Sequence, residues 1–218
     1  MSNSIRTIVP CLARALLLAC CFVAPASAAS LSVGVFKRDG HPLSGAVITV
    51  EPETGVSAAA PALRAIMDQV DLAFVPDVLV VPLHSTVQFP NSDAVGHQVY
   101  SFSSARQFQL PLYRGKPYPP VQFDQPGIVT LGCNIHDNMI GYIVVTAAPF
   151  YGRSDARGEW QARELPAGRY RVRVWHPLLA EPELLQTFDT ASGDKLEIRL
   201  SKSLRPAPLT GRPHSWDY

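Results

Sequence analysis

The sequence predicts an all-β fold made of two small β-sandwiches. Twenty prolines and fourteen glycines in 218 residues favour short strands joined by turns over long helices. Several stretches alternate apolar and charged residues, for example 169–174, which is the pattern of a strand with one buried face. Hydrophobic residues make up 47% of the chain and charged residues 17%, so a packed core is expected rather than disorder.

The balance of charges narrows the possible partners. Lysine and arginine together number 19, against 18 for aspartate and glutamate, so the formal net charge is +1. A protein that binds nucleic acid usually carries a broad basic surface to neutralise phosphates. We therefore expect no nucleic-acid partner.

The first residues are predicted to be a secretory signal peptide over 1–28. Basic residues precede the apolar run 15–24, and small residues follow it, which favours cleavage after Ala28 and export to the periplasm. The alternatives are a retained membrane anchor and a lipoprotein modified at Cys20. No later segment has the length that a membrane-spanning helix requires, so no transmembrane segment is expected after removal of the signal.

Removal of this peptide would leave one of the four cysteines, Cys133. Exported proteins usually pair their cysteines, so a single retained thiol calls for an explanation. It is either a buried, inert side chain or a thiolate that binds a metal ion.

The residues around Cys133 favour the metal. Cys133 ends the β-branched run 127–132, and the apolar run 140–145 follows a short loop that contains His136 and Met139. The loop thus offers a thiol, an imidazole and a thioether at three-residue intervals. Sulfur ligands combined with imidazole favour copper or zinc, and one Cys, two His and a weak Met form the ligand set of electron-transfer copper sites. Such a site needs a second histidine.

His97 is the best candidate for that histidine. It follows a strand at 87–89 and a polar loop that begins at Asn91, and it opens the next predicted strand. This position would place its imidazole at the mouth of a strand. The remaining histidines occupy turns, a strand end or the terminal tail and are weaker candidates: His41, His84, His176 and His214.

The segment 64–146 resembles the cupredoxins of the plastocyanin and amicyanin type. The resemblance lies in the spacing from Asn91 to His97 and in the short loop that runs from Cys133 to Met139. The runs around His97 and Cys133 are also similar to bacterial proteins labelled methylamine-utilisation proteins.

This resemblance implies a Greek-key β-sandwich that holds one copper ion in a type 1 site. It implies His97, Cys133 and His136 as the main ligands and Met139 as the weak axial ligand.

The resemblance also implies a one-electron carrier whose partner is a redox protein of the cell envelope. The ring edge of His136 would be the electron port, within an apolar rim that includes Ile135, Met139 and Ile140. The alternative is a protein that stores or delivers copper without carrying electrons. An enzyme is less favoured, because six histidines without a His-x-His pair offer little for a second copper centre.

The segments 30–56 and 147–203 together resemble a small transthyretin-like, carboxypeptidase-regulatory β-sandwich, into which the copper domain would be inserted. Strands are expected at 31–36 and 46–50 about an Asp-Gly turn. The alternatives are that 31–50 adds strands to the copper domain, and that the flanking part is a module that binds a partner protein. The tail 204–218 is expected to be mobile.

Overall fold

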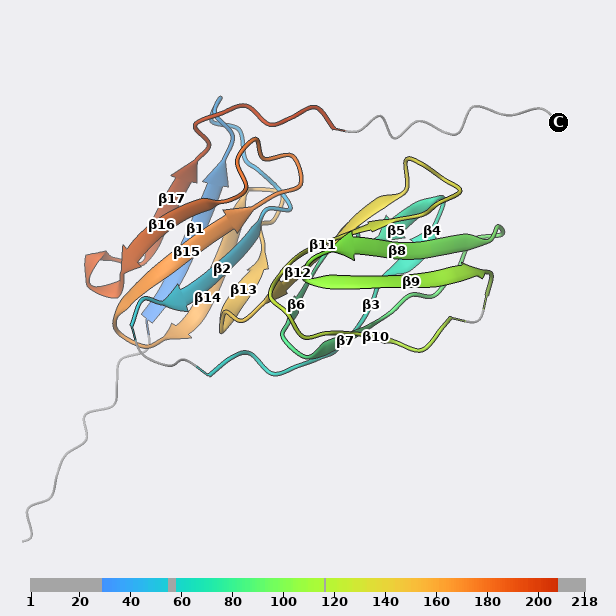
Figure 1. Cartoon of the computed structure of the whole chain (residues 1–218). Coiled ribbons are helices and arrows are strands. Elements are labelled where there is room, and N and C mark those ends of the chain that lie inside the picture. Colours follow the sequence, from blue (N-terminus) through green and yellow to red (C-terminus); the bar gives the residue numbers. More distant parts are fainter. Residues whose placement is uncertain (1–28, 55–57, 116, 208–218) are drawn as a thin grey trace, which may run out of the picture.

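The computed structural model describes residues 29–54, 58–115 and 117–207, whose strands form two lobes lying side by side (Figure 1). The predicted all-β class is confirmed, since the described residues contain strands and one 3-10 helix, η1 (Thr190–Ser192). The predicted signal peptide, with Ala28 and Cys20, lies outside the described residues. No described helix is long and apolar enough to cross a membrane.

The flanking lobe is built from strands at both ends of the described chain. Its two sheets enclose one core, to which both contribute fully buried side chains such as Val33 and Val172. One sheet has the order β14 (Glu159–Leu165), β1 (Ala29–Phe36), β17 (Lys195–Arg199). The other has the order β13 (Phe150–Arg153), β2 (Val47–Pro52), β15 (Arg169–Trp175), β16 (Leu184–Asp189).

The central lobe carries the residues predicted to bind a metal. Its largest sheet has the order β6 (Val78–Pro82), β12 (Ile140–Thr146), β11 (Gly127–Gly132), β8 (His97–Ser103), β9 (Arg106–Tyr113). A second sheet has the order β10 (Val121–Phe123), β7 (Ser85–Gln88), β3 (Arg64–Ile66). The strands β4 (Asp68–Val70) and β5 (Ala73–Val75) form a separate pair.

The core of the central lobe lies between these sheets and extends to the predicted site. Phe123 and Val129 are fully buried within it, and Cys133 and Met139 belong to the same cluster of buried residues. Burial of a large apolar side chain stabilises a fold by about 1.5–3 kcal/mol. The loop after β11 is therefore anchored by the same packing that holds the lobe together.

The turn expected at Asp39 and Gly40 is present, but the strands on either side of it do not pair with each other. The N–H of Gly40 donates to the carbonyl of Lys37 at 2.9 Å, and Gly40 has a φ of 89°. However, β14 and β17 already occupy both edges of β1, so β2 lies in the opposite sheet. The turn therefore connects the two layers of the flanking lobe.

The central lobe is inserted between two strands that pair with each other. In antiparallel register, Phe150 of β13 lies opposite Val50 of β2, and Arg153 lies opposite Val47. The chain thus leaves the flanking lobe at the end of β2 and returns beside it. The domain boundaries expected at residues 56, 64 and 146 remain predictions.

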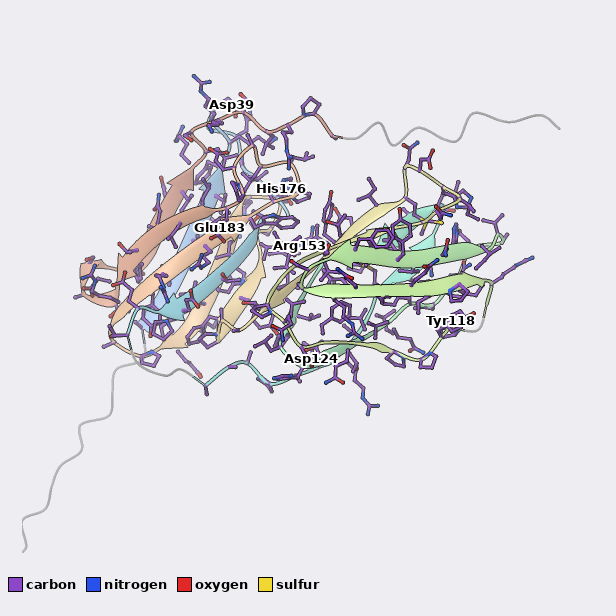
Figure 2. The ribbon with its side chains drawn as sticks, in the orientation of Figure 1. Asp39, Tyr118, Asp124, Arg153, His176 and Glu183 are labelled. Carbon is purple, nitrogen blue, oxygen red and sulfur yellow. The ribbon has the colours of Figure 1, made fainter. Side chains whose placement is uncertain are left out.

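The two lobes meet across the outer face of the largest central sheet. Val47 of β2 packs with Val78 and Val144 in a small buried cluster. Arg153 links the same surfaces, because its Nη1 donates to the carbonyl of Val78 at 2.8 Å and its Nε to the carbonyl of Gly45 at 3.4 Å. Figure 2 shows Arg153 where the lobes adjoin.

Part of the predicted tail packs against the flanking lobe. Leu204 contacts its core, and the backbone N–H of Arg205 donates to the carbonyl of Leu178 at 2.8 Å. Residues 208–218, with His214, lie outside the described part of the chain.

Candidate metal centre

The structure brings together the two histidines and the cysteine that the sequence singled out. His97 Nδ1 lies 3.1 Å from His136 Nδ1 and 4.0 Å from Cys133 Sγ, and Cys133 Sγ lies 3.6 Å from His136 Nδ1. Within the described residues, these form the one group of three or more His, Cys, Asp or Glu side chains close enough to share an ion.

The strand pairing accounts for this meeting of distant residues. His97 is the first residue of β8, and Cys133 directly follows β11, its neighbour in the sheet. Gly132 of β11 lies opposite Tyr100 of β8, which brings both donors to the same end of the sheet. His136 lies in the loop between β11 and β12. This loop is on the side of the central lobe that is turned away from the flanking lobe (Figure 1).

Two of the three donors are shielded from solvent. His97 has no exposed surface, and Cys133 is 3% exposed, whereas His136 is half-buried. Burial lowers the pKa of His136 and His97 lowers it further, against the opposing effect of Asp93. A lowered pKa keeps the imidazole neutral, which is the form that binds metals.

Met139 is buried in the same part of the central lobe as Cys133. Its side chain is 1% exposed, it belongs to the same buried cluster as Cys133, and both line a cavity of about 450 Å³. A turn positions it, since its N–H donates to the carbonyl of His136 at 2.9 Å. The expectation that Met139 forms part of an apolar docking rim is wrong, because this side chain is buried in the core of the central lobe. Ile135 and Ile140 are exposed as expected.

Sequence reasoning missed Asp93, which touches one of the candidate ligands. Its Oδ2 lies 2.6 Å from His97 Nε2, the ring nitrogen that faces away from Cys133. Burial raises the pKa of Asp93, but hydrogen bonds from Leu72, His97 and Asp71 outweigh burial and lower it overall. Asp93 is a polar residue in a loop, and nothing in the sequence around it predicts a contact with His97. The contact depends on the turn at Asp71 and Leu72, more than twenty residues earlier in the chain.

Asn91 fixes the loop that leads to His97. Its side-chain amide donates to the carbonyls of Val95 at 2.9 Å and Tyr113 at 3.0 Å, and its oxygen accepts from the N–H of Asp93 at 3.0 Å. The asparagine that the sequence marked at the start of the loop is thus 5% exposed and holds the loop in place.

The other described histidines do not join the group. His41 and His84 are exposed and lie beside Asp39 and Asp124, respectively. His176 follows β15 in the flanking lobe, and its Nδ1 accepts a hydrogen bond from the N–H of Leu178 at 3.2 Å. Figure 2 shows His176 on that lobe.

The spacing of the three donors fits one shared ion. Metal–nitrogen bonds of about 2.0–2.1 Å and metal–sulfur bonds of about 2.3 Å, as in zinc sites, allow two nitrogens on one ion to lie up to about 4.2 Å apart, and a nitrogen and a sulfur up to about 4.4 Å apart. All three donor separations, from 3.1 to 4.0 Å, are within this limit. One thiolate and two imidazoles form a donor set suited to a soft or borderline metal ion.

No family model matches the chain, and no curated protein matches it. A copper-containing nitrite reductase from Thermus scotoductus SA-01 is 27% identical over 44% of this chain, with a TM-score of 0.36, and the match spans 25% of that reductase. A purple cupredoxin from Nitrosopumilus maritimus is 22% identical over 37% of this chain and 96% of its own, with a TM-score of 0.33.

A reduced amicyanin mutant is 19% identical over 45% of this chain and 99% of its own, with a TM-score of 0.35. These TM-scores are below 0.5, so the likeness to these structures carries no conclusion about function. The resemblances to methylamine-utilisation proteins and to transthyretin-like domains stay predictions.

Proposed function

We propose that this chain binds one copper ion through His97, Cys133 and His136, with Met139 as a weak axial ligand, and carries single electrons. The observation that supports this proposal most directly is the convergence of one sulfur and two imidazole nitrogens within 4.0 Å of one another. One Cys, two His and a weak Met are the donors of electron-transfer copper sites. Copper, when bound, supplies a one-electron redox couple.

The protein's contribution is to hold these donors in place. His97 and Cys133 are buried against packed strands, so they have little room to move when the charge of a bound ion changes. This rigidity favours a carrier, because an electron moves fastest when few atoms must rearrange.

The half-buried ring of His136 is the proposed point of electron exchange. Ile135 and Ile140, which are close to His136 in the chain, have exposed apolar side chains, and so does Val95 in the loop before His97. Complexes between redox proteins are small and short-lived, which suits a modest apolar surface of this kind. We propose a redox protein of the cell envelope as the partner and the periplasm as the location, on the basis of the leader sequence. The proposed role is that of a carrier rather than an enzyme.

Copper(II) added to the purified protein tests the proposal. We expect an intense blue or green colour from the bond between copper and the Cys133 thiolate, and an EPR spectrum of one copper per chain. Cys133→Ser should abolish the colour, whereas His84→Gln, which changes an exposed histidine outside the group, should leave it intact. Copper bound without colour would contradict the proposed site.

Retention of the ion distinguishes a carrier from a delivery protein. A carrier should keep its copper through repeated reduction and reoxidation in the presence of a competing chelator. Loss of copper to the chelator within minutes would instead support storage or delivery.

A further inference from the structure

The contact between Asp93 and His97 links the candidate site to a second layer of residues. The two side chains lie 2.6 Å apart, with 11% of Asp93 and none of His97 exposed. Hydrogen bonds of this length that involve a charged group are among the strong ones in proteins. The pair is therefore a fixed feature of the site.

The chemistry of the pair dictates which nitrogen of His97 carries the proton. An ionised carboxylate can only accept hydrogen bonds, so His97 Nε2 must donate to Asp93. In the neutral ring, Nδ1 is then left with its lone pair. Nδ1 is the atom that faces Cys133 and His136, so the proton is held away from the metal-binding side.

Asp93 is itself held by a distant turn. Its Oδ1 accepts from the N–H of Asp71 at 2.6 Å, and its Oδ2 accepts from the N–H of Leu72 at 3.0 Å. Asp71 and Leu72 have φ values of 52° and 60°, in the left-handed region that is unfavourable for residues other than glycine. The carboxylate of Asp93 thus stabilises this turn, and the two N–H groups of the turn hold the carboxylate in the position where it contacts His97.

We propose that Asp93 orients His97 for metal binding and makes the site favour copper(II) over copper(I). The inference rests on the proposed copper site. A carboxylate that accepts a hydrogen bond from a ligand imidazole increases the electron-donating power of that ligand. Both this effect and the nearby negative charge stabilise the higher oxidation state, so Asp93 lowers the reduction potential of the site.

Asp93→Asn tests the proposal, because it removes the charge while keeping the size of the side chain. We expect the copper(II) affinity to fall at least tenfold, as is usual when such a partner of a metal ligand is lost, with a smaller change for copper(I). A tenfold difference between the two states raises the reduction potential by about 59 mV. Asp93→Glu, which keeps the charge, should recover part of the loss.

Asp68→Asn is the matched control. Asp68 is an aspartate of the same region whose Oδ2 accepts from the hydroxyl of Ser92 at 2.7 Å, but it has no contact with His97. If Asp93 acted only by holding the loop, both variants would shift the potential alike, or neither would shift it. Either result would overturn the proposal.

A measurement on the unaltered protein keeps the proposal testable even if Asp93→Asn fails to fold. Nitrogen-15 NMR of the metal-free protein should show His97 protonated on Nε2, with a slowly exchanging proton. Protonation on Nδ1 alone would contradict the proposal. Failure of the unaltered protein to bind copper would refute the proposed function, whereas the NMR result would still report on the pair.

Discussion

His176 shows how one half-buried side chain can make the stability of the flanking lobe depend on pH. Burial lowers the pKa of His176 below its ordinary value of 6.5. As the pH falls through about 6.5, His176 becomes protonated in the unfolded chain but stays neutral in the folded protein. The unfolded state is therefore stabilised, and the free energy of unfolding decreases. The decrease ends once the pH lies below the folded-state pKa.

We expect His176→Asn to flatten this dependence between about pH 7.5 and 5.5, since 6.5 is the ordinary histidine value. Urea unfolding of the metal-free protein at several pH values measures it. The difference between the variant and the unaltered protein is the relevant quantity, because the lowered pKa of His136 acts in the same direction. If the free energy of unfolding of the variant depended on pH as steeply as that of the unaltered protein, the prediction would be wrong. His41→Asn, at an exposed position, is the control.

At the scale of single residues, the sequence was sufficient to predict the candidate metal ligands but not the residues that contact them. Cys133, His136 and Met139 stand in one short loop, so their spacing alone predicted that they would lie together. Asp93 could not be found in this way. Its orientation depends on the backbone of Asp71 and Leu72, whose left-handed conformation no local pattern indicated.

Among the elements, β12 is closely packed against β5. A Cβ atom on Gly141 would lie 2.8 Å from Phe74 Cβ and 2.9 Å from Phe74 Cδ2. Phe74 is 2% exposed and has no room to move aside. Gly141→Ala should therefore destabilise the protein by about 1–3 kcal/mol, the usual cost of overpacking, as measured by urea unfolding.

Gly132→Ala is the comparison for this prediction. The added Cβ would lie 2.7 Å from Cζ and Oη of Tyr100, atoms at the far end of a half-buried side chain that can swing outward. We expect a smaller loss of stability than for Gly141→Ala. The reverse order would show that β5 and β12 are less tightly packed than the structure indicates.

The strands themselves were predictable, whereas their partners were not. The alternation of buried Tyr170, Val172 and Val174 with arginines identified β15 correctly. The same kind of pattern located β1 and β2 but could not place them in opposite sheets. Pairing depends on which edges are already occupied, and those edges belong to strands more than a hundred residues away.

For the molecule as a whole, Arg153 forms a polar link between the lobes. Arg153→Met would leave the carbonyl of Val78 without its hydrogen bond, and an unsatisfied buried group costs about 1–3 kcal/mol. We expect the lobes to unfold in separate steps in this variant. With Trp175 and Trp216 replaced by phenylalanine in every variant compared, Trp160 fluorescence reports on the flanking lobe, and the colour of added copper reports on the central lobe.

Asp77→Asn is the control, since the ion pair of Asp77 with Arg153 is solvent-exposed and such pairs contribute at most about 1 kcal/mol. Coincident transitions in Arg153→Met would mean that the apolar cluster of Val47, Val78 and Val144 suffices to join the lobes.

The pairing of β2 with β13 has a consequence for how such a chain can vary. The two ends of the central lobe emerge side by side from one ladder of hydrogen bonds, opposite each other at Val50 and Phe150. A tight hairpin could connect β2 directly to β13, so the two sheets of the flanking lobe could form without the central lobe. Lengthening, shortening or exchanging the central lobe would leave this ladder intact, so the central lobe can diverge in sequence while the flanking sandwich stays the same.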